Sequence, residues 1–288
     1  MAITIKEFYE GIVLKMSVLY PVNEAKAIAS HLFEHFLGLK SAERILVNAQ
    51  PVDNSAVKSI DNAVVKLLSS EPLQYVLGKA YFMDLEFTVN ASVLIPRPET
   101  EELVSLILKI YNTRRNGEII RVLDIGTGSG CIAVSLKKYL ADSIVTAIDV
   151  SGAALSQAVE NSRRNGVNIS FFKLDILKKE EWDLIGDFDL IVSNPPYVTE
   201  SEKLLMHANV LEYEPHSALF VPDDDPLLFY ETITQFAGMK LTVGGMLAFE
   251  INESFGLEVE RLLLLNEFRN IDLRKDMYNK NRFVFAER

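Results

Sequence analysis

The amino-acid sequence predicts an α/β fold: a seven-stranded, mostly parallel, doubly wound sheet of the Rossmann-like kind, preceded by a small all-helical N-terminal domain and a hairpin linker. From residue 121 onward, short apolar runs alternate with segments of helical periodicity. Such alternation indicates parallel strands joined by helical crossovers. Only residues 275–281 separate the last two strand candidates. This connection is too short for a parallel crossover, so we expect an antiparallel hairpin at the end of the sheet.

The larger domain, over residues 96–288, contains every element of this sheet. Short runs of branched aliphatic residues predict the strands, and apolar residues three or four positions apart predict the helices. Strands are expected at residues 121–124, 144–149, 170–175, 188–193, 246–251, 271–274 and 282–286. Helices between the first five strands are expected at residues 131–140, 153–165, near 177–182 and at 226–241. An earlier helix should begin with the acidic stretch at 99–102, because acidic residues favour a helix N-terminus, and end near Tyr111.

Residues 1–72 are predicted to form a small helical domain with a recognition or packing role. Thr4 and Glu7 have the spacing of a capping box, and apolar residues then recur at helical intervals up to Pro21. Asn23 is expected to cap a second helix. Further helices are expected at residues 41–47 and 55–68.

His31 and His35 in this domain match the H-x-x-E-H pattern of one class of zinc proteases. Leu32, Phe33 and Phe36 give the same segment the apolar stripe of an amphipathic helix. We therefore assign both histidines to a structural helix and expect no metal site.

Residues 73–95 are expected to form a β-hairpin linker, with strand-like segments at 80–82, 85–89 and 93–95. Arg97 follows between Pro96 and Pro98, in a rigid and extended position.

Composition and charge limit the possible classes of function. Hydrophobic residues make up 49% and charged residues 24% of the chain, which is ordinary for a globular protein. No apolar run could span a bilayer, and a single cysteine, Cys131, fits a reducing compartment. The first residues show no basic region followed by an apolar one, so we do not expect secretion. We therefore expect a cytoplasmic location and no membrane partner. The formal net charge of −11 argues against direct DNA binding, because lysine and arginine supply that attraction.

A glycine-rich turn follows the first strand of the predicted sheet. Gly126, Gly128 and Gly130 alternate with Thr127 and Ser129. Glycines allow positive φ angles and close approach of a ligand to the backbone. The spacing differs from that of the P-loop and from the usual dinucleotide fingerprint, so the turn alone is a weak signal.

Polar residues follow at the ends of the next strands. Asp149 ends the second strand, Asp175 ends the third, and Asn194 comes directly after the fourth. Ligands of doubly wound sheets bind at such carboxyl ends, and an acidic residue placed like Asp149 takes ribose hydroxyls. If the first and fourth strands are neighbours, the glycine turn and Asn194 face one cleft.

The turn Asn194-Pro195-Pro196-Tyr197 ends the strand at 188–193. Two prolines remove two backbone donors and fix two φ angles, so neither a helix nor a strand can continue. A stiff turn then holds an amide and an aromatic ring, which together can hydrogen-bond to and cover a planar, amide-like group. In the alternative interpretation, Asn194 and Tyr197 are incidental to a strand-ending turn.

The glycine turn, Asp149 and the turn at 194–197 together resemble a class I S-adenosylmethionine (SAM)-dependent methyltransferase that alkylates a planar nitrogen. Residues 72–78 (PLQYVLG) and 93–101 (VLIPRPETE) resemble the hallmark of the HemK/PrmC family, the peptide chain release factor glutamine methyltransferases. The resemblance covers the whole chain. It implies a SAM-dependent methyltransferase domain over 96–288, methylation of N5 of the glutamine in the Gly-Gly-Gln loop of release factors, and S-adenosylhomocysteine as the product.

The resemblance also implies a role for each candidate site residue. Asp149 would bind the ribose of SAM. The residues expected to contact SAM are Gly126, Thr127, Gly128, Ser129, Gly130, Asp149, Asp175, Ile176 and Asn194. The catalytic turn would comprise Asn194, Pro195, Pro196 and Tyr197, and these four residues with Arg97 would bind the substrate. The Asn194 side-chain oxygen and the Pro195 carbonyl would accept hydrogen bonds from the two N–H groups of the substrate amide.

The chain departs from the family pattern at two places. Asn252 follows Glu250 and Ile251 where the family has glycine, and Asp223, Asp224 and Asp225 occupy a segment that is usually glycine-rich. We expect these three adjacent carboxylates to be solvated.

Other functions stay open. A ribosomal-protein glutamine methyltransferase would share much of the pattern, but such enzymes generally lack the Arg-Pro-Glu-Thr-Glu sequence. A nucleic-acid adenine-N6 methyltransferase would use the same turn but would need a basic surface. A non-catalytic binding module of the same fold is the third alternative.

Overall fold

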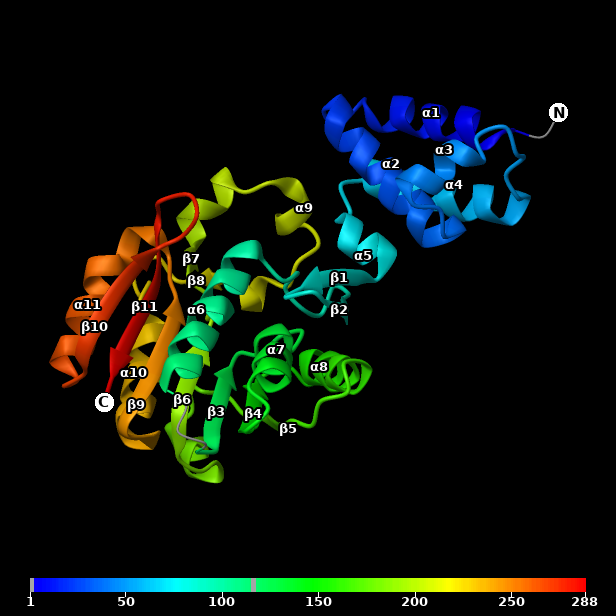
Figure 1. The fold of residues 1–288 in the computed structure, drawn as a ribbon. Coiled ribbons are helices and arrows are strands. Elements are labelled where there is room, and N and C mark those ends of the chain that lie inside the picture. The colour runs from blue at the N-terminus through cyan, green and yellow to red at the C-terminus, as the bar shows by residue number, and fades with distance from the viewer. Residues whose placement is uncertain (1–2, 115–117) are drawn as a thin grey trace. The chain divides into compact units, whose positions relative to one another are not determined.

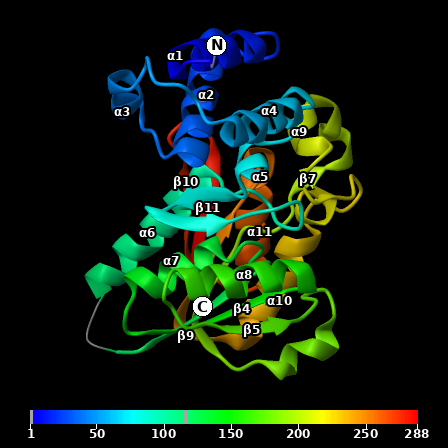
Figure 2. The ribbon, with the colours of Figure 1, turned by 90° about the vertical axis from the view of Figure 1, so that its right-hand side faces the viewer.

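The computed structural model describes residues 3–114 and 118–288, which form two compact units (Figures 1 and 2). One unit comprises Met1–Gly78 and His207–Tyr213, and the other comprises Lys79–Met206 and Glu214–Arg288. The segment His207–Tyr213 thus belongs to the N-terminal unit, although it lies within the predicted larger domain over 96–288. The Tyr213 hydroxyl donates to the Ser69 carbonyl at 2.6 Å inside that unit.

The N-terminal unit is helical and has its own apolar core. The predicted capping box is confirmed: Thr4 Oγ1 accepts the Glu7 N–H at 3.3 Å, and the Glu7 carboxylate accepts the Thr4 N–H at 3.0 Å. Asn23 is not a cap, because the second helix already begins at Val22 after Pro21, whose fixed φ suits a helix entry. The helices are α1 (Ile5–Met16), α2 (Val22–Leu37), α3 (Ser41–Leu46), α4 (Asn54–Leu68), α5 (Leu73–Leu77) and α9 (Ala208–Leu211).

The histidines of the H-x-x-E-H segment lie on exposed positions of α2, next to the fully buried Leu32 and Phe33. Within residues 3–114 and 118–288, no three His, Cys, Asp or Glu side chains are grouped so that they could hold a metal ion.

The hairpin consists of β1 (Lys79–Phe82) and β2 (Leu85–Thr88) and is shorter than the expected linker at 73–95. Its two turn residues, Met83 and Asp84, both have positive φ angles, as the twist of a tight hairpin requires. The linker prediction is wrong at both ends, because residues 73–77 form α5 and residues 93–95 form no strand. The N–H of Val93 bonds back to Asn90, and the N–H of Ile95 bonds to a side chain instead of a neighbouring strand.

The seven-stranded sheet has the order β10-β11-β9-β6-β3-β4-β5. β11 runs antiparallel to both of its neighbours and forms the predicted closing hairpin with β10. β3 and β6 are parallel neighbours, so the predicted adjacency of the first and fourth strands is confirmed. The strands are β3 (Ile120–Ile125), β4 (Ser143–Asp149), β5 (Ser170–Lys173), β6 (Phe188–Ser193), β9 (Leu241–Glu250), β10 (Arg269–Lys275) and β11 (Asn281–Glu287).

Helices cover both faces of the sheet (Figure 1). Successive side chains of a strand point to opposite faces, so Val122 packs with the core beneath α6 and α7 while Leu123 packs with the core beneath α10 and α11. The helix α11 was not expected from the sequence. The helices are α6 (Pro98–Arg114), α7 (Cys131–Tyr139) and α8 (Gly152–Arg164) on one face, and α10 (Leu228–Lys240) and α11 (Gly256–Leu265) on the other.

Short elements complete the second unit. A small parallel pair, β7 (Val198–Thr199) and β8 (Phe220–Val221), follows the proline turn. Short 3-10 helices occur at Lys179–Leu184, Glu200–Leu205, His216–Ala218 and Glu253–Phe255. None of the helices in the described part of the chain is both long enough and apolar enough to cross a membrane.

Candidate functional site

The glycine turn joins β3 to α7 with a backbone that only glycine adopts readily. Gly126, Gly128 and Gly130 have φ angles of 72°, 53° and 81°. At Gly130 a Cβ atom would lie only 3.0 Å from the Cβ atom of Ala158 in α8. The glycines therefore provide both the curvature of the turn and its close packing against α8.

Asp149, the last residue of β4, is bound to this turn. Its carboxylate accepts the N–H of Gly128 at 2.9 Å and the N–H of Ser151 at 2.8 Å. Burial raises the pKa of Asp149, while these two hydrogen bonds oppose the rise. A carboxylate has about four acceptor positions, so Asp149 can still accept bonds from hydroxyl groups of a ligand.

A cavity of about 130 Å³ lies at this edge of the sheet. Thr127 is buried and donates to Asp124 at 2.6 Å, and the carbonyl of Ser129 accepts from Asn161 at 2.9 Å, so both are engaged within the protein. Asp175 lies beyond the end of β5 at Lys173, and not at the strand end as expected. The predicted SAM-contact residues in the cavity wall are Gly126, Gly128, Asp149, Asp175, Ile176 and Asn194.

Three segments of the cavity wall were not predicted from the sequence. They are mostly apolar, and nothing in their local pattern distinguishes them from core residues. The chemistry of the complete wall is mixed: it offers a carboxylate at Asp149, the backbone of the glycine turn, and apolar side chains at Ile176 and Phe229. The three segments are Ser92, Val93 and Leu94, then Pro215, Ser217 and Ala218, and finally Phe229 and Ile233 of α10. Further unpredicted wall residues lie close in sequence to predicted ones: Ile125, Ile148, Val150, Ser151, Ala154, Leu174 and Ser193.

Asp124 lies in β3 beneath the glycine turn and is fully buried. Its Oδ2 accepts the Thr127 hydroxyl at 2.6 Å and the Ala133 N–H at 3.2 Å. Among the residues that the structure describes, its Oδ1 has no hydrogen-bond partner. Burial raises the pKa of Asp124 to about 7, and the charge of Asp149 adds to the rise.

A second cavity, of about 60 Å³, adjoins the proline turn. Asn194 and Pro195 line both cavities, whereas Pro196 lines only the larger one. Arg97 and Tyr197 are in the wall of the smaller cavity. The turn at 194–197 therefore lies where the two spaces meet, and four of the five predicted substrate residues surround the smaller one.

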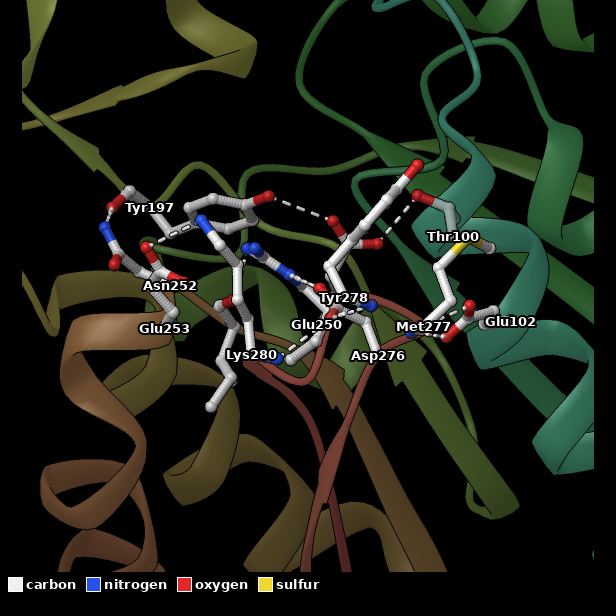
Figure 3. A network of polar contacts seen from close by, with 12 residues as sticks. Thr100, Glu102, Tyr197, Glu250, Asn252, Glu253, Asp276, Met277, Tyr278 and Lys280 are labelled. Carbon is white, nitrogen blue, oxygen red and sulfur yellow. Dashed lines mark hydrogen bonds and ion pairs between the residues drawn. The ribbon is translucent and has the colours of Figure 1, made fainter. Parts of the chain in front are cut away.

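Hydrogen bonds hold both ends of this turn, and Figure 3 shows those at the Tyr197 end. The Asn194 Nδ2 atom donates to the Thr100 hydroxyl at 3.1 Å, and the Thr100 hydroxyl donates to Glu250 at 2.7 Å. The Tyr197 hydroxyl donates to the other oxygen of Glu250 at 3.0 Å. Burial raises the pKa of Glu250 and also that of Tyr197. Thr100 and Glu250 were not among the site residues expected from the sequence.

Asn252, at the position where the resemblance led us to expect glycine, also contacts the turn. Its Nδ2 atom donates to the Tyr197 carbonyl at 3.1 Å and to the Glu202 carboxylate at 3.1 Å. Its side-chain oxygen accepts the Ser254 N–H at 3.0 Å. Asn252 therefore links the turn to Glu202 through hydrogen bonds.

The acidic loop at residues 223–225 is exposed. Asp223 accepts the Ser201 N–H at 3.0 Å, and this hydrogen bond lowers its pKa.

Two family profiles match the chain. Residues 104–214 match the family described as the methyltransferase small domain, and residues 19–78 match the PrmC N-terminal domain. A crystal structure of a methyltransferase from Pyrococcus furiosus has a similar fold, with a TM-score of 0.52 at 19% identity. The similarity covers 79% of this chain and 98% of that chain.

The fold, the glycine turn and the mixed cavity define a class I SAM-dependent methyltransferase. The donor set fits SAM, because the cavity combines a carboxylate for ribose hydroxyls with apolar side chains for a planar base. A release factor glutamine methyltransferase of Flavobacterium psychrophilum is 43% identical over 280 residues, covering 97% of this chain and 98% of the relative. One from Bacteroides thetaiotaomicron is 41% identical over 271 residues, covering 94% and 95%. The chain belongs to the release factor glutamine methyltransferase (HemK/PrmC) family, as its motifs predicted.

Proposed function

We propose that this chain transfers the methyl group of SAM to the side-chain amide nitrogen of the glutamine in the Gly-Gly-Gln loop of peptide chain release factors. The observation that carries the proposal is the position of Asn194 and Pro195 in the walls of both cavities. The turn then lies where a methyl donor in the larger cavity meets a side chain in the smaller one. The names of the relatives support a release factor as the substrate.

The chemistry of an amide explains why such a turn is needed. The nitrogen lone pair of glutamine is delocalised into the carbonyl, so the nitrogen is a poor nucleophile. SAM supplies a methyl group activated by its sulfonium. The Asn194 side-chain oxygen and the Pro195 carbonyl accept hydrogen bonds from the two N–H groups of the substrate amide. Both oxygens then face a nitrogen that becomes positive as the N–C bond forms. The methylated amide nitrogen is strongly acidic and loses its proton to water, so no side-chain base is required.

Other residues of the turn position the substrate. The Tyr197 ring covers the amide plane and favours positive charge at its face. Arg97 lines the smaller cavity while it is paired with Glu214, so it shapes the pocket for the glutamine. Fixed orientation supplies a large part of the rate.

The larger cavity holds SAM in this proposal. Asp149 accepts bonds from the ribose hydroxyls, and Asp175 and Ile176 flank the adenine. The backbone at Gly126 and Gly128 lies against the rest of the molecule. The turn also contains Thr127, Ser129 and Gly130, which contribute to SAM binding by fixing the shape of the turn.

A labelling experiment tests the proposal. SAM with a labelled methyl group is incubated with the chain and, in separate reactions, with a release factor, with ribosomal proteins and with duplex DNA. Label is expected only on the release factor, and a release factor with alanine in place of the loop glutamine should stay unlabelled. The Asn194→Ala variant of this chain controls for contaminating activity. Label on DNA or on a ribosomal protein alone would overturn the proposal. Methylation of release factors would also place the enzyme in translation termination and in the cytoplasm.

A further inference from the structure

Glu250, the last residue of β9, is a buried carboxylate that the proposed chemistry does not use. Only 1% of Glu250 is exposed. Its Oε2 accepts the Thr100 hydroxyl at 2.7 Å and its Oε1 accepts the Tyr197 hydroxyl at 3.0 Å (Figure 3). Burying a carboxylate is unfavourable unless hydrogen bonds and nearby positive charge compensate. The position of Glu250 beside the catalytic turn therefore calls for a functional explanation.

The charge around Glu250 favours its ionised form only in part. Arg282 acts on the carboxylate as a positive charge, while Glu99 acts against it. Arg282 itself is bonded to Asp276 at 3.2 Å and to the Ile251 carbonyl at 3.1 Å, which fixes the guanidinium near the end of β9. The hydroxyls of Thr100 and Tyr197 also lower the pKa of Glu250, but burial outweighs them and the pKa stays raised.

The hydrogen bonds from Asn194 to Glu250 run in one direction. The Thr100 hydroxyl donates its single hydrogen to Oε2 of Glu250 at 2.7 Å. Thr100 Oγ1 can then only accept from Asn194, and Asn194 Nδ2 lies 3.1 Å away. The amide orientation of an asparagine is assigned from such a network. The NH2 half of the Asn194 amide therefore faces Thr100, and its Oδ1 is left for the substrate.

We infer that Glu250, acting through Thr100, is a positioning residue that keeps the side-chain oxygen of Asn194 turned toward the substrate amide. This inference rests on the proposed function. With the opposite orientation, the Asn194 NH2 group would meet the N–H donors of the substrate and would repel the positive charge that develops there. Because Glu250 also binds the Tyr197 hydroxyl, one buried carboxylate holds both ends of the turn.

Isosteric variants of Thr100 test this inference. Thr100→Val removes the hydroxyl but keeps the shape, so we expect kcat to fall by about 10- to 100-fold, because a misplaced reacting group can cost about 100-fold. The KM for the release factor and the Kd for SAM should change less than about twofold, because Thr100 lines neither cavity. Thr100→Ser, which restores the hydroxyl, should recover most of the wild-type kcat. A Thr100→Val variant with normal kcat would overturn the inference.

Thr234→Val in α10 is the matched control. Thr234 is also fully buried, and its hydroxyl has no hydrogen-bond partner among the described residues. The control should keep the wild-type kcat and show whether replacing a buried hydroxyl by a methyl group disturbs the fold.

A double-mutant cycle separates positioning from a general structural effect. If Thr100 acts through Asn194, Thr100→Val should cause no further loss of kcat in the Asn194→Ala background. Full multiplication of the two losses would overturn the inference. A second cycle combines Tyr197→Phe with Thr100→Val. It measures how much of the loss of kcat comes from the Tyr197 end of the turn and how much from the Asn194 end.

A measurement without release factor distinguishes a failure of this inference from a failure of the proposed function. In the 15N-labelled protein, one proton of the Asn194 side-chain NH2 group should exchange slowly with solvent, and this protection should be lost in Thr100→Val. Equal exchange in both proteins would overturn the orientation assigned to Asn194. If the wild type labels no release factor but the protection is observed, only the proposed substrate fails.

Discussion

The guanidinium of Arg97 lies 2.5 Å from a carboxylate oxygen of Glu214, and the side chain of Glu214 is completely shielded from solvent. The other oxygen of Glu214 accepts the N–H of Ile95 at 3.1 Å. This carboxylate therefore joins the segment before α6 to a part of the chain 117 positions away, beside the smaller cavity.

Replacing Arg97 by alanine should destabilise the protein. The variant leaves the buried Glu214 carboxylate without its cation. Because about a third of the Arg97 side chain is exposed, the loss of folding stability should be smaller than for a fully buried ion pair. We expect the free energy of unfolding to fall by about 2 kcal/mol. Urea denaturation measures this change. Adding Glu214→Gln should recover part of the loss, since it removes the unpaired charge, and an additive loss would contradict this explanation.

Asn194→Ala should separate catalysis from SAM binding. Losing one partner that stabilises developing charge lowers turnover by roughly 10²–10³-fold. The Kd for SAM should change only a few-fold, because Asn194 is one of many residues in the wall of the larger cavity. Single-turnover methylation and calorimetric titration measure the two quantities. A near-normal single-turnover rate would refute the role given to Asn194.

Asp149→Ala should act mainly on SAM binding. It removes the proposed acceptor of the ribose hydroxyls and also the bonds to the N–H groups of Gly128 and Ser151. Hydrogen bonds to a charged group contribute about 1.5–3 kcal/mol, so the Kd for SAM should rise by about 10- to 100-fold. Asp224→Ala, in the exposed loop, should leave the Kd unchanged. If Asp149→Ala lowered only turnover at saturating SAM, the assignment would be wrong.

Asp124 should make stability depend on pH. Burial raises its folded pKa from the ordinary 3.8 to about 7. The folded state therefore keeps a proton that the unfolded state releases, so the stabilisation is complete below pH 3.8 and is lost as the pH rises through about 7. Between pH 5 and pH 7 the loss should be on the order of 2 kcal/mol.

Asp124→Asn is the matched variant for this pH dependence. Asparagine imitates the protonated acid and keeps an acceptor for Thr127, so its stability should vary less over the same interval. Denaturant midpoints at pH 5 and pH 7 provide the comparison. Parallel pH profiles for the two proteins would show that Asp124 is ionised throughout the range.

Gly130→Ala should disturb the glycine turn. The new Cβ would lie 3.0 Å from the Cβ and 3.2 Å from the Cα of Ala158, at a φ of 81°. We expect a lower Tm and weaker SAM binding, because strain at a positive φ costs about 1 kcal/mol before any clash. Gly238→Ala in α10, where the new Cβ would meet nothing within 4 Å, should be neutral or stabilise by about 0.5–1 kcal/mol. Equal Tm values for the two variants would contradict the packing argument.

Local patterns predicted the sheet domain well. The spacing of apolar residues located all seven strands and placed the closing hairpin, because strand and helix periods differ and a short connection forbids a parallel crossover. The errors lie where tertiary contacts override local pattern. Residues 93–95 have a strand-like sequence but bond to Asn90 and Glu214, and Asn23 lies inside a helix that begins at Val22.

The candidate site divides in the same way. The sequence by itself determined the glycine turn, Asp149 and the turn at 194–197, because glycine conformations and paired prolines constrain the backbone within a few residues. Only the tertiary structure identified Thr100, Glu214 and Glu250 as partners of this site. Thr100 lies 94 positions from Asn194, and Glu214 lies 117 positions from Arg97. Glu250 lies 150 positions from Thr100 and 53 from Tyr197. A threonine or glutamate has no local signature for such a role, and its partner is set by which strand and helix ends the fold brings together.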